Sequence, residues 1–519
     1  MSTKDVRKMF GLSYQISDEW DIMSAMNNRP PAVLSKSKYL EGLQCPKLLW
    51  YEYNRQRDIP GIDAKTQAVF DEGKRVGEWA QKLFPEGIKI ERDFDPAKQS
   101  KKSLEALKLR KPLFEAGFVY GRAYALADIL VPVEDDAWDL IEVKSSTQVK
   151  NEHYYDAAFQ KYAYEGAGLK IRKCFLMHIN NAYLRRGAVE PDKLFAKINI
   201  MAEAQEKQAE VAREIEKMVK VIASPEMPDI KVGPQCGTPH ECRLEDVCWS
   251  FLPDKDHVFI LYKAGKFRYE LLERGIVNIS EIPVEELNEK QTAQVMSHRT
   301  GEAHIEEAAV REFLKKINYP VYFLDFETIG PAIPVYDNSR PYQEIPFQYS
   351  LEVIEREGAA PKHFGYLAPG TVDPRPEVLR QLKERLCEEG SIVAYSAQFE
   401  MKVIKNAAEV YRDFLPWAEV TQKRFVDLLE PFKDFIYYHP DQAGSASLKR
   451  VLPAITGSTY EGLSIADGQT AAAEYFRVTF NKDVEEKDRR KVRDDLEKYC
   501  DTDTRGMVEV LSALRQSVK

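Results

Sequence analysis

The spacing of apolar and polar residues predicts strands alternating with helices in the first half of the chain. Residues 114–133, FEAGFVYGRAYALADILVPV, have the composition of strands, the acidic residues 134–136 form a turn, and WDLIEVKSS, 138–146, forms the returning strand. Apolar residues then recur at helical spacing over 154–166, and 197–223 has the pattern of a long amphipathic helix. Together these elements predict an α/β domain.

The C-terminal part of the chain mixes the same element types. YPVYFLDFE, 319–327, is an apolar run typical of a buried strand, and 492–514 has the apolar period of a helix. A chain of 519 residues is too long for one core, since a domain usually takes about 100–200 residues. We therefore predict an α/β multidomain protein. Its predicted parts are an extension over 1–32, a domain over 33–253, a small helical connector over 254–318 and a second domain over 319–519.

Composition narrows the class of protein. Apolar residues make up 44% of the chain and charged residues 30%, as in ordinary globular proteins. No run approaches the roughly 18 apolar residues of a membrane span, and the first residues lack the apolar segment of a secretory signal, so we expect a cytoplasmic protein without a membrane partner. The net charge of −9 argues against a passive nucleic-acid coat but not against an enzyme with an acidic site.

One group of polar residues surrounds the strand predicted at 138–146. Glu142 and Lys144 are two residues apart, so they point to the same face of that strand, and Asp128 ends the strand before it. Asp128 and Glu142 would hold Mg²⁺ or Mn²⁺, while Lys144 would orient a water or stabilise developing charge. Gln160 and Tyr164 lie on one face of the next helix and could meet the substrate. The plainer alternative is an exposed Glu142–Lys144 ion pair.

A second group has the same i, i+2 arrangement. Asp325 and Glu327 end the apolar strand at 319–327, and Tyr499 and Asp503 share one face of the final helix. Three carboxylates from these two elements could bind two metal ions for in-line attack of water on a phosphodiester, with Tyr499 positioning that water. The alternative is a strand that ends in two solvated acids.

The seven cysteines are unevenly distributed. Cys45 stands alone near the start, whereas Cys236, Cys242 and Cys248 lie within CGTPHECRLEDVC. A disulfide framework is not expected in a cytosolic chain. The remaining cysteines have the apolar or helical surroundings of ordinary buried thiols. These are Cys174, Cys387 and Cys500.

The residues of the first domain resemble the RecB-type nucleases of the PD-(D/E)xK superfamily, through Asp128, EVK at 142–144 and QKYAY at 160–164. The four cysteines around this region resemble those of iron–sulfur nucleases such as AddB and the CRISPR-associated RecB-like nucleases. That resemblance implies a 4Fe-4S cluster that staples the ends of the domain, with zinc as the second choice and unliganded thiols as the third. GKRVG, 73–77, departs from the pattern, because Gly77 stands where many members have a metal-binding His. Glu72 and Glu78 are possible substitutes.

The second domain resembles the DEDD 3′–5′ exonucleases, which have an RNase H-like fold. Y-x-x-x-D at 499–503 matches their tyrosine subclass, but Glu400 stands where the middle motif normally has Asp. Asp427 is the nearest extra carboxylate that could support this site. GSASLKRVLP, 444–453, resembles the helical segment between the middle and last motifs.

From about residue 33 onward, the chain resembles an uncharacterised bacterial family that joins these two nuclease types. The resemblance implies a metal-dependent nuclease with 3′–5′ exonuclease activity, acting on DNA in repair or in defence against foreign DNA. Because Gly77 and Glu400 depart from the family patterns, an alternative interpretation is a nucleic-acid-binding or scaffolding protein with decayed sites. An RNA-directed exonuclease is a further alternative. The basic residues 98–111 and the segment carrying Arg340, Tyr342, Phe347 and Tyr349 are possible nucleic-acid contacts, although a solvated face and core packing are the plainer roles.

Overall fold

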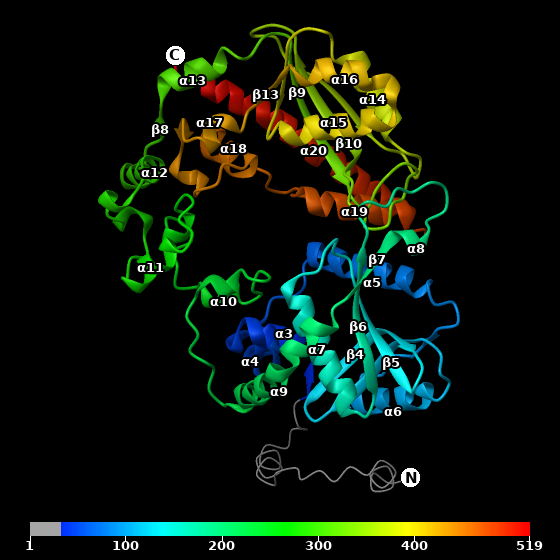
Figure 1. The fold of residues 1–519 in the computed structure, drawn as a ribbon. Coiled ribbons are helices and arrows are strands. Elements are labelled where there is room, and N and C mark those ends of the chain that lie inside the picture. The colour runs from blue at the N-terminus through cyan, green and yellow to red at the C-terminus, as the bar shows by residue number, and fades with distance from the viewer. Residues whose placement is uncertain (1–32) are drawn as a thin grey trace.

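The computed structural model describes residues 33–519, so the predicted extension over 1–32 lies outside the described residues. Figure 1 shows two lobes, each built around its own β-sheet, and a run of short helices that links them along one side. The predicted mixed α/β architecture with several sheets is confirmed. Within 33–519, no helix has both the length and the apolar character needed to cross a bilayer.

The first lobe contains a seven-stranded sheet in the order β2-β3-β4-β5-β6-β7, with β1 paired to β4. Strands β3, β4 and β5 form an antiparallel meander, and β6 runs parallel to β5 after a helical crossover. The predicted strands and the turn at 134–136 are therefore confirmed. The strands are β1 (Leu34–Ser35), β2 (Ile88–Lys89), β3 (Leu113–Tyr120), β4 (Ala123–Pro132), β5 (Ala137–Lys144), β6 (Lys170–Ile179) and β7 (Phe195–Asn199).

Helices cover both faces of the first sheet because side chains alternate along its strands. Leu130 and Leu140 pack toward α7 and α9, whereas Ile129 and Ile141 pack toward α5. The predicted long helix begins at Met201 and not at 197, since residues 197–199 pair with β6 as part of β7. The helices are α3 (Lys36–Gln44), α4 (Pro46–Asn54), α5 (Ala64–Gln81), α6 (Pro96–Leu107), α7 (Asn151–Gly166), α8 (Pro191–Leu194) and α9 (Met201–Ala223).

The linking segment forms a small core of its own around Val258, Leu271 and Val295. Its C-terminal end packs with the second lobe, because β8 (His304–Ile305) pairs with β14 (Tyr437–Tyr438) and Phe313 enters the core of that lobe. The helices of the segment are α10 (Glu245–Cys248), α11 (Phe267–Glu273), α12 (Glu289–Thr300) and α13 (Glu307–Leu314).

The second lobe contains a five-stranded sheet in the order β11-β10-β9-β12-β13. Strands β9, β10 and β11 are antiparallel neighbours, and β12 and β13 run parallel to β9. The strand predicted at 319–327 is thus the central strand. The strands are β9 (Val321–Ile329), β10 (Ile345–Ile354), β11 (Lys362–Leu367), β12 (Ser391–Ala394) and β13 (Phe425–Asp427).

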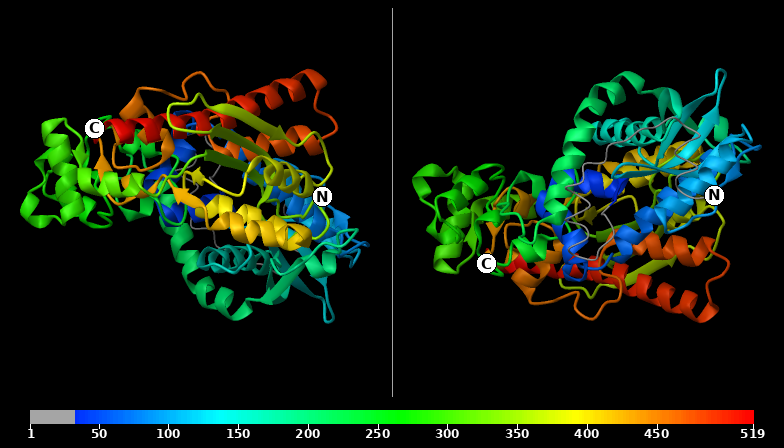
Figure 2. Two further views of the ribbon diagram at one scale, coloured as in Figure 1. Left: turned by 90° about the horizontal axis from the view of Figure 1, so that it is seen from above. Right: turned by 90° about the horizontal axis from the view of Figure 1, so that it is seen from below.

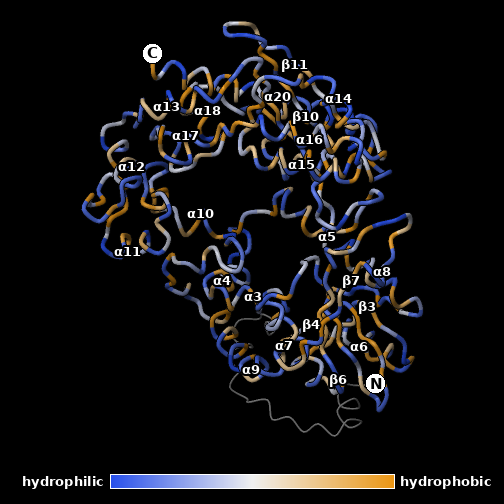
Figure 3. The backbone as a smooth tube through the Cα atoms, turned by 45° about the horizontal axis from the view of Figure 1, so that its top comes forward, coloured by the Kyte–Doolittle hydropathy of each residue, from blue (hydrophilic) through white to orange (hydrophobic). Residues whose placement is uncertain are grey.

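Two helical layers cover the second sheet. Tyr322 and Leu324 of β9 face α14, α15 and α16, whereas Val321 and Phe323 face α18 and α20. Figure 2 shows α20 on one side of the sheet and α14–α16 on the other, and Figure 3 shows hydrophobic stretches along the strands. The helices are α14 (Arg375–Arg385), α15 (Gln398–Val410), α16 (Leu415–Gln422), α17 (Glu430–Lys433), α18 (Leu448–Thr456), α19 (Gly468–Phe480) and α20 (Glu486–Gln516).

A loop of the second lobe, 331–344, fixes the two lobes together. Ala332 is buried among apolar side chains of the first lobe, and its backbone N–H donates to Glu72 Oε1 over 2.8 Å. Arg185 exchanges backbone hydrogen bonds with the loop at Asn338 and Ser339. Tyr342 donates its hydroxyl to the carbonyl of Ser145, the residue after Lys144. The loop that follows β9 therefore ends beside the last residue of β5.

Candidate functional site

Three carboxylates converge in the second lobe. Suitable oxygen atoms of Asp325, Glu327 and Asp503 all lie within 4.8 Å of one another, and no other such group of three acidic, His or Cys ligands occurs in residues 33–519. Asp325 and Glu327 lie on the same face of β9 as Val321 and Phe323, and that face packs against α20. Asp503 lies on α20, so strand alternation places the first two acids on one face and the packing of α20 on that face brings in the third.

These carboxylates are poorly neutralised by the protein. Burial raises the pKa of Asp325 well above its usual range, and the nearby Asp503 raises it further. Burial and the charges of Asp325, Asp503 and Asp467 raise the pKa of Glu327, whereas Lys449 lowers it. Buried, closely spaced carboxylate oxygens without a paired cation are the donor set that Mg²⁺ and Mn²⁺ prefer. The acidic cluster could therefore hold a divalent metal ion.

Two tyrosines contact Asp503. Tyr499, one turn earlier on α20, hydrogen-bonds the carboxylate, as the Y-x-x-x-D spacing predicts. Tyr460 donates its hydroxyl to Asp503 Oδ1 over 2.5 Å. The Lys449 ammonium lies 5.2 Å from the centre of the Tyr499 ring. Tyr460 was not predicted, because it lies in a loop with no recognisable spacing to the other residues.

Glu400 approaches this cluster from another element. It lies in the first turn of α15, its side chain is buried, and its Oε2 atom has no hydrogen-bond partner among the described residues. Burial and the charge of Asp325 raise its pKa well above the usual range. Glu400 is outside the group of three that lies within 4.8 Å. Asp427 instead accepts backbone hydrogen bonds from Ser396 and Leu429, which fix the turns after β12 and β13.

The start of α19 limits the space around Glu327. Asp467 caps this helix by accepting the backbone N–H groups of Gln469 and Thr470. A Cβ atom added at Gly468 would lie 3.3 Å from Glu327 Oε2, closer than most Cβ contacts. Glycine at position 468 therefore lets the helix start approach the carboxylate.

The group in the first lobe combines two acids with two lysines. Lys144 Nζ lies 2.7 Å from Glu142 Oε1 and 2.6 Å from Asp156 Oδ2. Lys36 Nζ lies 2.6 Å from the same Glu142 oxygen and 3.4 Å from Asp156 Oδ1. Burial opposes ionisation of Glu142, but the two lysines outweigh it and lower the pKa of that carboxyl. Burial likewise opposes charge on Lys144, yet Asp156 and Glu142 raise its pKa above the usual range.

The other predicted residues of the first lobe differ in how closely they approach this group. Gln160 donates to Glu142 over 2.6 Å and to Asp156 over 2.9 Å. Asp128 accepts the backbone N–H of Val143 over 2.7 Å, and burial together with the charge of Glu142 raises its pKa to about 7. Tyr164 is fully buried, and its hydroxyl faces the Ala116 carbonyl at 3.5 Å. The charges of Lys36 and Lys144 lower the pKa of Asp128 and only partly offset these two effects.

Sequence reasoning missed Lys36 and Asp156. Asp156 is one helical turn before Gln160 on α7, so helical spacing from Gln160 could have found it. Lys36 comes from the start of α3, more than a hundred residues before Glu142, and a lysine at a helix start gives no such signal. Glu72 does not substitute for the missing His, since its carboxylate accepts from the second lobe, and Glu78 is exposed.

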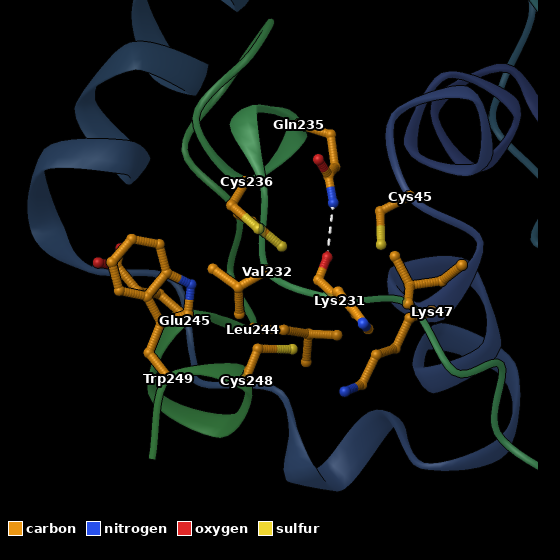
Figure 4. A pocket seen from close by; sticks show the side chains of 12 residues that line it. Cys45, Lys47, Lys231, Val232, Gln235, Cys236, Leu244, Glu245, Cys248 and Trp249 are labelled. Carbon is orange, nitrogen blue, oxygen red and sulfur yellow. Dashed lines mark hydrogen bonds between the residues drawn. The ribbon is translucent and has the colours of Figure 1, made fainter. Parts of the chain in front are cut away.

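The four predicted cysteines line one pocket, together with Lys47, Leu244 and Trp249. Figure 4 shows the sulfurs of Cys45, Cys236 and Cys248 directed into it. Burial raises the pKa of Cys242 to about 11, with a contribution from its neighbouring thiols. All the described cysteines are free thiols, so the sulfurs are available as ligands.

The pocket joins two distant segments of the chain. Cys45 lies between α3 and α4, and the other three cysteines lie in the segment that ends with α10. Gln44 donates to the carbonyls of Gln235 and His240 over 2.9 and 2.7 Å. The residue that starts α3 is Lys36, so one helix connects the cysteine cluster with the first charged centre.

Comparisons with known proteins identify relatives of parts of this chain. A family model described as a domain of unknown function, DUF2779, matches residues 322–447. Uncharacterized protein UU173 of Ureaplasma parvum is 27% identical over 236 residues, covering 41% of this chain and 34% of that protein. Uncharacterized protein MG366 homolog of Mycoplasma pneumoniae is 27% identical over 211 residues, covering 37% and 31%. The chain spans about a third of the length of the curated relatives it matches.

The matched family segment contains part of the acidic cluster. Residues 322–447 include Asp325, Glu327 and Glu400 but not Tyr499 or Asp503. The descriptions of the relatives name no activity, so conclusions about chemistry depend on the side chains of this chain.

Proposed function

We propose that this protein is a metal-dependent nuclease with 3′–5′ exonuclease activity, directed to DNA. In this proposal the first lobe has a RecB-like PD-(D/E)xK nuclease fold and the second an RNase H-like exonuclease fold. The observation that carries the proposal is the cluster of Asp325, Glu327 and Asp503, with Tyr499 one helical turn from Asp503. Its buried carboxylates lack a paired cation, which favours a metal-binding role over a pair of solvated acids.

In the acidic cluster of the second lobe, called the second centre below, the residues have separate roles. Asp325, Glu327 and Asp503 bind the metal, which when bound lowers the pKa of a water and stabilises charge on the phosphate. Burial and the charge of Asp503 raise the pKa of Tyr499 well above its usual range, so its hydroxyl keeps its proton and can orient a water. Lys449, on α18 beside Tyr499, can supply positive charge to the incoming phosphate.

In the first centre, Asp128 and Glu142 are the proposed metal ligands. Lys144 and Lys36 remain charged, so they can stabilise negative charge that develops on a phosphate. Gln160 holds Glu142 and Asp156 in place through its amide. The RecB-like resemblance and this arrangement favour a second, independent phosphodiester centre.

The cysteine pocket is proposed to hold a 4Fe-4S cluster, with zinc as the second choice. Four thiolates at about 2.3 Å from one zinc ion would bring the sulfurs to about 3.8 Å from one another. Within residues 33–519, no three cysteine sulfurs lie within 4.8 Å of one another. This wider spacing favours a 4Fe-4S cluster over a single zinc ion. The cluster would act structurally, by tying α3 and α4 to the segment that ends with α10.

One alternative function, binding of nucleic acid without cleavage, also has specific support. Gly77 replaces a family His and Glu400 replaces a family Asp, as expected if the sites have decayed and the protein only binds nucleic acid. The experiment is to incubate the purified protein with end-labelled single- and double-stranded DNA and RNA in Mg²⁺, Mn²⁺ or EDTA. We expect metal-dependent degradation of DNA. Failure to degrade any of the four substrates would reject the nuclease, and preference for RNA would reject the DNA assignment.

Variants separate the two centres. Lys144→Ala removes a charge from the first centre, and Asp325→Ala with Glu327→Ala disables the second. We expect each variant to keep the activity of the other centre, with 3′-terminal release lost only in the second variant. If one variant alone abolishes all degradation, the protein has a single active centre.

A further inference from the structure

A polar pocket of about 710 Å³ lies between the two lobes. Its first-lobe side is formed by 145–148, Lys150 and Asn181, and its second-lobe side by 340–344 and Asn406. The loop 331–344 that builds the second side is also the loop that fixes the lobes together. The pocket is therefore a feature of the assembled chain, and neither lobe forms it alone.

The pocket is lined by segments that follow or precede, along the chain, the elements of both charged centres. Ser145 follows Lys144 directly at the end of β5. On the other side, Ile345 pairs with Ile329, two residues beyond Glu327 on β9. Asn406 lies on α15, six residues after Glu400, which corresponds to about 9 Å along a helix. The pocket is thus built by segments that join directly to the elements of both centres.

The lining suits a phosphate backbone. Lys150 and Arg340 are exposed cations, with Lys150 Nζ 3.8 Å from Glu152 Oε1, while the one acid of the lining, Glu344, is paired with Lys402 over 2.7 Å. Among the described residues, the side chains of Thr147, Asn181 and Asn406 have no protein hydrogen-bond partner. Hydroxyl and amide groups beside two cations can donate to phosphate oxygens without reading sequence.

We propose that this pocket binds the sugar–phosphate backbone of a single DNA strand and guides it between the two centres. The proposal rests on the proposed nuclease function and extends it by assigning the substrate a path. A volume of about 710 Å³ is that of a pocket for a drug-sized ligand, so it admits a short stretch of one strand but not a duplex turn. The Tyr342 ring, half-buried in the wall, offers a surface on which a base can stack.

The test uses changes that alter the charge of the lining, and the acidic ones also preserve side-chain shape. Gln148→Glu with Asn406→Asp adds two negative charges to the lining, and Asn406→Lys adds a positive one. The control, Gln205→Glu with Gln516→Glu, adds the same two negative charges at exposed helical positions outside the pocket. Binding of a fluorescein-labelled 12-nucleotide strand is followed by anisotropy in EDTA, over a range of salt concentrations.

We expect the doubly acidic pocket variant to bind about tenfold more weakly, with a shallower salt dependence, since each lost phosphate contact removes about 0.7 from the slope for single strands. Asn406→Lys should bind more tightly, and the control should match wild type. Equal affinities for all four proteins would overturn the proposal. Tighter binding of a duplex than of the single strand would also overturn it.

A second measurement separates this proposal from the nuclease function. Hydrolysis of bis(4-nitrophenyl) phosphate in Mn²⁺ needs a metal centre but no strand in the pocket. We expect the pocket variants to hydrolyse this small diester at the wild-type rate. Absence of hydrolysis in wild type would count against the proposed function, whereas the binding comparison decides the pocket independently.

Discussion

Lys36 donates a 2.6 Å hydrogen bond to Glu142, a residue 106 positions later in the chain. It also lies 3.4 Å from Asp156, which Lys144 contacts from the other side. Two cations thus share two buried carboxylates, and one of those cations comes from the helix that leads to Cys45. The charge balance of the first centre therefore depends on a segment that the cysteine pocket anchors.

Lys36→Ala is expected to impair the first centre while the second remains active. Loss of one preorganised cation typically costs about 10²–10³ in rate, and the lost charged hydrogen bond costs about 2 kcal/mol of unfolding free energy. The measurements are DNA cleavage in the Asp325→Ala, Glu327→Ala background and thermal unfolding. Lys38→Ala is the control, because Lys38 pairs with Glu52 over 2.6 Å and not with the centre. Equal activity of the two lysine variants would contradict the role of Lys36.

Cys45→Ser is expected to remove the cluster and to loosen α3. The anaerobically purified wild type should be brown, and the variant should lose that absorption together with most first-centre activity. Cys174→Ser is the control, since Cys174 is buried in the core of the first lobe away from the pocket. A colourless wild type containing zinc would refute the iron–sulfur assignment, and full activity of Cys45→Ser would refute the coupling to Lys36.

The metal-free protein should lose stability as the pH rises. Burial raises the pKa values of Asp325, Glu327 and Glu400, so the folded state keeps protons that an unfolded chain releases above about pH 4. The unfolding free energy in EDTA should therefore fall from about pH 4 upward, and Mn²⁺ should restore it most at high pH. Thermal unfolding at several pH values checks this. The variant Asp325→Asn with Glu327→Gln should show a weaker pH dependence, and an equal slope would contradict the explanation.

Gly468→Ala is expected to weaken metal binding in the second centre. The added Cβ would lie 3.3 Å from Glu327 Oε2, so the carboxylate or the start of α19 must shift by a few tenths of an ångström. We expect a higher Mn²⁺ concentration for half-maximal 3′-terminal release. Gly77→Ala is the matched control, since its Cβ meets nothing within 4 Å and alanine favours a helix by about 1 kcal/mol. An unchanged metal requirement in Gly468→Ala would contradict the steric argument.

Local periodicity was sufficient to predict the strands and helices that carry the charged residues. Alternation along β9 predicts that Asp325 and Glu327 share a face, and helical spacing predicts that Tyr499 and Asp503 do too. Their convergence could be expected only from the resemblance to known nucleases, because nothing local relates β9 to α20. The four cysteines were likewise grouped by resemblance, and they line one pocket.

Contacts between distant segments could not be predicted. Lys36 and Tyr460 reach their carboxylates from a helix start and a loop, where spacing carries no information. The start of the helix predicted at 197 was wrong because pairing with β6 outweighs helical spacing at 197–199. The role of Glu72 depends on a contact between lobes, which no pattern within α5 encodes.

The most direct test of the central claim is a sulfur-substitution experiment on the scissile phosphate. A single-stranded DNA with one non-bridging phosphate oxygen replaced by sulfur at its 3′-terminal linkage is digested in Mg²⁺ and in Mn²⁺. Sulfur binds Mg²⁺ poorly and softer metals better, so release of the last nucleotide should fall sharply in Mg²⁺ and recover in Mn²⁺ for one stereoisomer. A metal held by Asp325, Glu327 and Asp503 predicts that result, and equal release from both stereoisomers and the normal linkage in Mg²⁺ would contradict it.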